Sequence, residues 1–342
     1  MSVAAAAPRP RAHQVSATKA VVQWYLQNHF GRPSDPGVLE MFCDPDRVGS
    51  FAVDRRGLRM GEGRALFRLL VATSMFQRLR DIQILRILKE MPARDADEIA
   101  DAGRLLNLVD EGRCEHMRST TTLVERCDLT KDPRTRLGCC TANKEVACHL
   151  KRHTVVLKRY GHFGKVPTSI ALMVREAGVD NLSALRLKVM AAERDPLLRA
   201  QALEAALSRA WRVNQKIASM FLSMVTNPDL SRGFAPWSQG LDWTYYVVID
   251  SNVDLFLASI GYDGIGTYDA RRDFVRTVAR NIDLSEFNAK LHAFNPRVVQ
   301  QAMYLFMSNA NRHAAETDCI HSAPSACAGC PGPLRRRCPA HA

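Results

Sequence analysis

Four cysteines near the C-terminus constrain this chain more than any other feature of its sequence. They follow the pattern C-x7-C-x2-C-x7-C in a short segment rich in proline and glycine, at Cys319, Cys327, Cys330 and Cys338. Such a segment has little to pack on its own, so thiolates that converge in it indicate a shared metal, either one zinc ion or a cubane iron–sulfur cluster. The alternative is a disordered tail whose thiols are open to oxidation.

The composition describes an ordinary globular protein with an unusual charge. The 342 residues can form two modest domains or one large domain with insertions, and 46% hydrophobic with 24% charged residues is typical of soluble proteins. The net charge of +12 indicates a polyanionic partner, nucleic acid before membrane. A basic surface that is only solvated is the alternative.

Nothing in the sequence predicts a membrane span or an export signal. No stretch reaches the roughly 18 apolar residues that a span requires, and the N-terminal MSVAAAAPRPRAHQ lacks a long apolar core. Ten cysteines, several at ligand spacings, fit a reducing compartment better than a disulfide framework. We therefore expect a monomeric cytoplasmic protein, associated with the nucleoid in a bacterium, that contacts no membrane.

Apolar residues recur at helical spacing along most of the chain, and no alternation is long enough for a substantial sheet. We therefore expect an all-α protein. A disordered basic leader, 1–16, and an N-terminal helical segment, 17–60, come first, with a turn cluster at 31–37. Predicted helices follow over 61–77, 81–91, 95–110, 166–178, 195–211 and 214–225, and two or three more run to residue 311. Gly178 has the position of a C-cap.

Lys216 follows a tight turn, Arg212–Asn214, in the first turn of the helix that begins after it. The N-terminal amides of a helix disfavour the protonated form of a lysine and can hold a backbone phosphate. A lysine whose amine is neutral is a nucleophile. A lysine at a helix start is, however, usually only solvated.

Asp250 follows an apolar run and precedes Ser251 and Asn252, which predicts that it caps the next helix. Capping is a sufficient role for such an aspartate. An aspartate at the mouth of an apolar segment can also face a cleft, where it stabilises a cation or accepts a proton.

In their order along the chain these motifs resemble the helix–hairpin–helix (HhH-GPD) DNA glycosylases, in the branch of endonuclease III and the plant 5-methylcytosine glycosylases. The family hairpin L-P-G-V-G-x-K-T-A corresponds here to Arg212, Val213, Asn214, Gln215, Lys216, Ile217 and Ala218, and the motif V-D-T-H-V to residues 249–253. LVATSMFQRLRD offers Gln77 and Asp81 at the place of the family's L-L-S-x-Q and the following Asp. The tail is similar to the family's C-x6-C-x2-C-x5-C loop, with both outer gaps longer.

The resemblance implies an all-α, two-lobed core over 61–90 and 166–311, a [4Fe–4S] cluster loop over 312–342, and double-stranded DNA as the partner. It implies that Gln77 fills the gap left by an extruded base, that Lys216 attacks the sugar, and that Asp250 assists. DNA contacts are expected from the hairpin and from the basic run beside the cluster, at Gln77, Arg212, Asn214, Gln215, Arg335, Arg336 and Arg337. The implied activity is excision of a modified or damaged base with abasic-site lyase chemistry.

This sequence departs from the family at the hairpin and between its two catalytic motifs. Both hairpin glycines are replaced, by Arg212 and Asn214, although glycine allows close approach to a phosphate and positive φ. Asparagine tolerates that conformation, whereas arginine suits it less but adds a charge contact. A Trp-bearing loop, 227–243, lengthens the distance in sequence from Lys216 to Asp250. A protein that keeps the scaffold and binds DNA without catalysis is therefore the alternative, and a zinc-tailed basic adaptor for RNA or protein is a third possibility.

The family does not explain the insertion over 91–165. It contains Cys and His residues that could form a second metal site, although their spacings match no familiar zinc pattern: Cys114, His116, Cys127, Cys139, Cys140, Cys148, His149 and His153. Free thiols are the other interpretation. Its basic end, 151–165, interleaves aromatic residues and suits contacts to phosphates and bases, or forms a solvated helix.

Overall fold

The protein is all-α in the part of the chain that the computed structural model describes. Those residues are 9–31, 39–77, 80–111, 115–127, 165–231, 235–308, 330 and 332–339, and they contain helices and turns but no strand. They fall into two compact units. Unit 1 comprises Met1–Leu39, Leu222–Ser238 and Trp243–Ala342, and unit 2 comprises Glu40–Phe221 and Gln239–Asp242.

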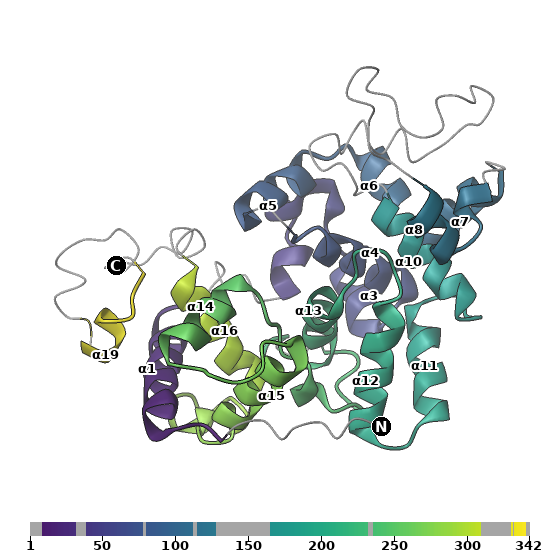
Figure 1. Cartoon of the computed structure of the whole chain (residues 1–342). Helices are drawn as coiled ribbons and strands as arrows, with labels where there is room; N and C mark the ends of the chain where they lie inside the picture. The colour runs from purple at the N-terminus through teal and green to yellow at the C-terminus, as the bar shows by residue number, and fades with distance from the viewer. Residues whose placement is uncertain are drawn as a thin grey trace. The chain divides into compact units, whose positions relative to one another are not determined.

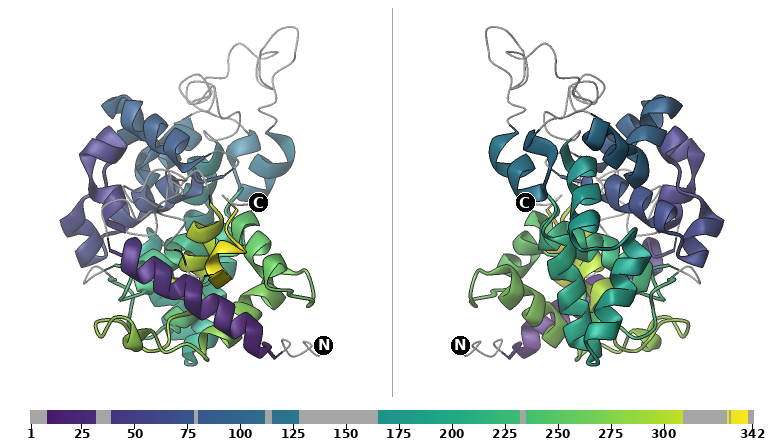
Figure 2. Two further views of the ribbon diagram at one scale, coloured as in Figure 1. Left: turned by 90° about the vertical axis from the view of Figure 1, so that its left-hand side faces the viewer. Right: turned by 90° about the vertical axis from the view of Figure 1, so that its right-hand side faces the viewer.

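Unit 1 is built around α16 (Pro296–Met307), which contacts α1 (Ala12–Asn28), α14 (Ser251–Ser259) and α15 (Tyr268–Ala279) (Figures 1 and 2). Its apolar core includes Tyr25, Phe256, Phe274 and Phe306, and Leu334 of the short α19 (Gly332–Arg335) joins it. Short 3-10 turns lie at η6 (Trp243–Tyr245) and η7 (Leu284–Glu286). The first helix begins at Ala12, within the expected leader, because the side chain of Gln14 accepts from the backbone N–H of Arg11 and closes the first turn.

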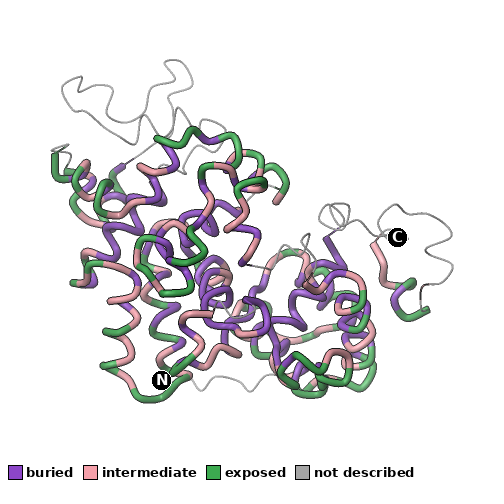
Figure 3. Tube along the Cα trace, turned by 180° about the vertical axis from the view of Figure 1, so that it is seen from behind, coloured by how far each residue is buried: buried purple, intermediate pink, exposed green. Residues whose placement is uncertain are grey.

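Unit 2 is built around α4 (Gly63–Ser74) and α10 (Lys165–Glu176), whose residues are mostly buried (Figure 3). The pair contacts α3 (Arg55–Met60), α7 (Ala102–Glu111), α8 (Thr120–Arg126) and α11 (Leu182–Ala192). The other helices of this unit are α2 (Pro45–Val48), α5 (Asp81–Glu90), α6 (Ala93–Ile99) and α12 (Pro196–Leu207), with 3-10 turns at η1 (Leu39–Cys43), η2 (Gly49–Phe51) and η3 (Glu115–Met117). Helix α13 (Gln215–Thr226) begins in unit 2 and ends in unit 1.

Most predicted helices are present, and two differences are informative. The single helix predicted over 95–110 is wrong: α6 ends at Ile99 and α7 begins at Ala102, directly after Asp101, whose Oδ1 accepts from the backbone N–H of Arg104 at 3.0 Å. Helix α11 was not predicted from the sequence. The predicted C-cap at Gly178 is confirmed, since its φ is 67° and its N–H donates to the carbonyl of Arg175 at 2.9 Å.

Several predictions fall on residues that the structure leaves undescribed. These are most of the leader, the turn cluster 31–37 except Gly31, and the centre of the insertion, 128–164, with Cys139, Cys140, Cys148, His149 and His153; Cys114 also lies outside the described residues. The described parts of the insertion are helical: 91–111 contains α6 and α7, and 115–127 contains η3 and α8. No helix in the described ranges has the length and apolarity to cross a membrane.

Candidate functional site

The turn between α12 and α13 keeps a glycine-like backbone without glycine. Arg212 has a φ of 64°, which makes it the one non-glycine residue with positive φ in the described part of the chain. The next residue, Val213, is buried, and its N–H donates to the carbonyl of Ala210 at 3.0 Å. A side chain in the left-handed region costs roughly 1–2 kcal/mol. Neighbouring contacts must therefore stabilise this turn.

One such contact comes from Trp211 and two cationic side chains. The guanidinium carbon of Arg212 lies 5.0 Å from the centroid of the indole, and Nζ of Lys165 lies 4.8 Å from it. The backbone N–H of Trp211 donates to Oγ of Ser169 at 2.6 Å. Lys165 is itself buried and donates to the carbonyl of Cys127 at 2.6 Å. The start of α10 thus supports the hairpin and holds the end of α8.

The second contact comes from Gln77, just beyond α4. Its Nε2 donates to the carbonyl of Arg212 at 3.0 Å and to that of Ser74 at 2.6 Å. Two segments 135 residues apart in sequence, both selected by the resemblance, therefore meet within unit 2. Because both amide hydrogens are used, movement of Gln77 into a gap in DNA would require these bonds to break.

Lys216 lies in the first turn of α13, two residues after the residue that caps the helix. Oδ1 of Asn214 accepts from the backbone N–H of Ile217 at 3.2 Å, and the Asn214 carbonyl accepts from the N–H of Ala218 at 2.9 Å. Lys216 is half-buried and forms no ion pair with any residue that the structure describes.

Asp250 is the N-cap of α14, as the sequence predicted. Its Oδ1 accepts from the backbone N–H of Val253 at 2.9 Å. The residues directly before it, 245–249, are buried, and the hydroxyl of Tyr268 bridges two of them: it donates to the carbonyl of Val247 at 2.9 Å and accepts from the N–H of Ile249 at 3.4 Å. Tyr268 positions this segment, yet nothing in the local sequence around Asp250 points to it. Asp250 lies in unit 1, whereas Lys216 lies in unit 2.

Two of the four predicted metal ligands are described. Cys330 and Cys338 are half-buried and pack against the core of unit 1, which Leu334 between them enters. Cys319 and Cys327 lie outside the described residues. No group of three possible metal ligands is found among the residues described.

The basic run beside these cysteines is only partly available to a ligand. Arg335 and Arg336 are exposed, whereas Arg337 is half-buried and donates from its guanidinium to the carbonyl of Pro333 at 3.0 Å. Of the three predicted contacts, Arg335 and Arg336 are the two whose side chains extend into solvent.

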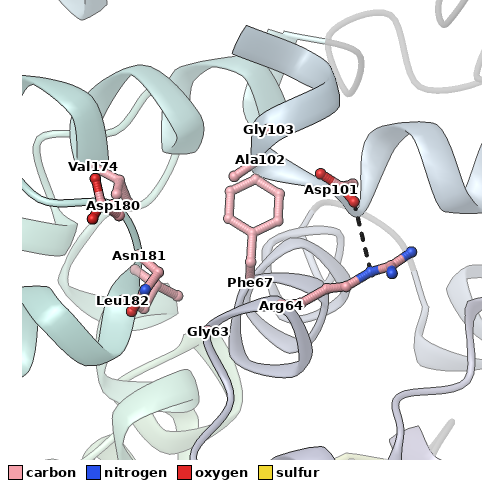
Figure 4. A pocket seen from close by; sticks show the side chains of 10 residues that line it. All are labelled: Gly63, Arg64, Phe67, Asp101, Ala102, Gly103, Val174, Asp180, Asn181 and Leu182. Atoms are coloured by element: carbon pink, nitrogen blue, oxygen red, sulfur yellow. Dashed lines mark ion pairs between the residues drawn. The ribbon is translucent and has the colours of Figure 1, made fainter. Parts of the chain in front are cut away.

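A pocket of about 170 Å³ in unit 2 is a different feature. It is formed where α4, α7 and α11 begin, with Phe67 at its centre and an Arg64–Asp101 ion pair of 3.6 Å at its edge (Figure 4). None of the predicted site residues lines it. Its volume is below the roughly 300 Å³ of a typical drug-sized site.

Comparisons with protein-family models, with curated proteins and with solved structures give no match for this chain. The resemblance to the glycosylases therefore rests on the four motifs.

Proposed function

We propose that the protein is a DNA glycosylase that extrudes and excises a modified or damaged base and then cleaves the abasic site through a lysine Schiff base. The observation that carries the proposal is the hydrogen bond from Gln77 to the carbonyl of Arg212. It brings the residue expected to fill the gap in DNA to the hairpin that precedes the expected nucleophile. The left-handed backbone at Arg212 supports the same assignment, because the family uses glycine in this turn.

DNA would be held by charge and by backbone amides. The net charge of +12 favours a polyanion, and the N-terminus of a helix such as α13 attracts a phosphate. Gln215 and Asn214 lie at this N-terminus, where they can contact the same strand. In the family a glycine at this position lets the backbone approach the phosphate closely. Here the guanidinium of Arg212 can bind a phosphate oxygen instead. Arg335 and Arg336 add exposed charge in unit 1.

The chemistry follows from the two expected catalytic residues. Extrusion of the nucleotide costs roughly a few kcal/mol and exposes C1′ of its sugar. Lys216, as a neutral amine, attacks C1′ while Asp250 stabilises the cation that develops on the sugar and assists proton transfer. The base departs, and the Schiff base that remains can eliminate the 3′ phosphate.

The four C-terminal cysteines would hold a [4Fe–4S] cluster with a structural role. Cys330 and Cys338 lie against the core of unit 1, so a cluster there would fix α19 and its arginines. A single zinc ion is the other occupant that four thiolates suit. Purified protein is brown with the cluster and colourless with zinc.

A DNA-binding protein without catalysis is the second candidate. The replacement of both hairpin glycines favours it, because the backbone at Arg212 and Asn214 carries side chains where a phosphate would approach. Retention of both Lys216 and Asp250 favours the enzyme.

A trapping experiment separates the two candidates without knowledge of the base. Anaerobically purified protein is incubated with a duplex that carries one abasic site, and borohydride is added to reduce any Schiff base. We expect a covalent protein–DNA band that is lost in Lys216→Gln. Lys89→Gln, a change at an exposed lysine of α5, is the matched control and should keep the band. Binding without any band would favour the non-catalytic candidate.

A further inference from the structure

A buried carboxylate holds an exposed imidazole in unit 1, outside the residues that the proposed reaction uses. The side chain of Asp229 is 3% exposed and that of His292 is 57% exposed, and Nδ1 of His292 lies 2.8 Å from Oδ1 of Asp229. The other oxygen, Oδ2, accepts from the backbone N–H of His292 at 3.2 Å. Both ends of the carboxylate thus fix the position of one histidine.

Two asparagines fix the carboxylate in turn. Nδ2 of Asn295 donates to Oδ2 of Asp229 at 2.7 Å, and the amides of Asn295 and Asn227 bond to each other in both directions at 3.0 Å. Oδ1 of Asn227 also accepts from the backbone N–H of Asp229 at 3.0 Å. Buried polar side chains that satisfy one another in this way hold a functional group in one orientation.

This network determines which ring nitrogen of His292 is available to a ligand. An ionised carboxylate only accepts, so Nδ1 of His292 carries a hydrogen and donates it to Asp229. Nε2 makes no hydrogen bond to any residue that the structure describes. In the neutral ring Nε2 is an acceptor, and in the imidazolium it becomes a donor.

A carboxylate and an indole contact the imidazole ring. Asp229, from the segment after α13, contacts its Nδ1 side, and the indole of Trp243 in η6 lies 5.4 Å away between centroids. The exposed Lys290 lies on the same loop, two residues before His292. Because Asp229 is buried behind the ring, the outward face presents positive charge when Nε2 is protonated.

We propose that His292, held by Asp229, binds a backbone phosphate of DNA through Nε2–H. The inference rests on the DNA binding in the proposed function but not on the chemistry of Lys216. With Nδ1 bonded to Asp229, a donor at Nε2 exists only in the imidazolium, so the contact requires the protonated ring.

The test measures how salt weakens binding at two pH values. The probe is a short fluorescein-labelled duplex that carries a tetrahydrofuran abasic analogue, which cannot form a Schiff base, and the readout is fluorescence anisotropy. Each phosphate contact adds about 0.9 to the slope of log affinity against log salt concentration. The wild-type slope should therefore be steeper by about 0.9 at about pH 6 than at about pH 8, values on either side of the usual histidine range.

The variants identify the group responsible. His292→Gln should show the same slope at both pH values, with a thermal melting curve like that of the wild type because the side chain is mostly exposed. His13→Gln is the matched control, an exposed histidine of the same unit whose Nε2 lies 3.3 Å from the carbonyl of Ile260. It should behave as the wild type does.

Three results would overturn the inference, and they separate it from the proposed function. If His292→Gln keeps the pH-dependent slope, another group is responsible. If the wild type binds with no such change while Lys216 is trapped by borohydride, the inference fails and the proposed function stands. If the chain does not bind duplex DNA at all, both fail.

Discussion

The two helix starts that carry Lys216 and Asp250 are stabilised in opposite ways. At α14 the expected functional residue is itself the cap, since Oδ1 of Asp250 accepts from the N–H of Val253. At α13 the cap is Asn214, and Lys216 follows it without an ion pair among the residues described. Asp250 is therefore both a structural and a candidate catalytic residue, whereas the helix start at α13 is capped by a residue other than the candidate nucleophile.

The preceding turns differ as well. The segment before Asp250 is buried, and the hydroxyl of Tyr268 bonds to its backbone. The turn before Lys216 has a residue in the left-handed region and depends on Gln77 and Trp211. Substitutions around Lys216 therefore test the backbone of the turn. Substitutions at Asp250 change both the unfolding free energy and the catalytic rate, unless the new residue also caps α14.

Loss of the proposed cluster should have the largest effect, and this effect should appear in unit 1, which contains Asp250. Cys330→Ser and Cys338→Ser should each lose iron and acid-labile sulfide, and hydrogen exchange should rise in α1, which contacts α19. Cys43→Ser is the matched control, because burial raises the pKa of Cys43 to about 11, so that it is not a thiolate at neutral pH. Full iron content in both tail variants would refute the assignment of these ligands.

Paired substitutions at Asp250 separate its two roles. Asp250→Asn retains a good cap, so its stability should match the wild type, while abasic-site cleavage should slow by about 100- to 1,000-fold through loss of the charge. Asp250→Ala should lose the same activity and also about 1 kcal/mol of unfolding free energy. Cleavage rates and urea unfolding check both. An Asn variant with full activity would leave Asp250 as a cap alone.

Gln77→Glu should destabilise the hairpin next to Lys216. A carboxylate would face the carbonyls of Ser74 and Arg212, to which the amide now donates, at a cost of about 1–3 kcal/mol. Gln77→Ala, which removes the donor without adding charge, should cost less. Urea unfolding of the two variants measures the difference, and equal stabilities would argue against the hydrogen bond to Arg212.

The smallest effect concerns the backbone of the same turn. Arg212→Gly relieves the left-handed conformation, whereas Arg212→Ala keeps it, and both remove the contact with Trp211. We expect the Gly variant to be more stable than the Ala variant by about 1 kcal/mol, measured by urea unfolding. A Gly variant that is the less stable of the two would mean that residue 212 does not adopt positive φ.

The sequence predicted those parts of the fold that local patterns encode. Apolar periodicity located α4 and α10. Gly178 after α10 and Asp250 before α14 are residue types that commonly end and begin helices, and both were predicted as caps. The break at Asp101 was not recognised because apolar residues continue on both sides of it. Helix α11 was missed because its apolar residues do not keep to one face: Leu182 and Leu185 are buried while Leu187 is exposed.

The candidate site depends more on tertiary contacts, which local patterns do not report. Residue preferences argue against positive φ at Arg212, and it is Trp211 and Gln77 that accompany this conformation. Tyr268 and the Asp229–His292 pair act across segments far apart in sequence, so no spacing rule identifies them.

The most direct test of the account is to identify the amine that borohydride links to an abasic site. The reduced adduct would be digested with trypsin and nuclease, and the modified peptide sequenced by mass spectrometry. We predict that the sugar remnant is attached to Lys216 in the first turn of α13. Attachment to the N-terminal amine or to another lysine would contradict the assignment of Lys216 as the nucleophile.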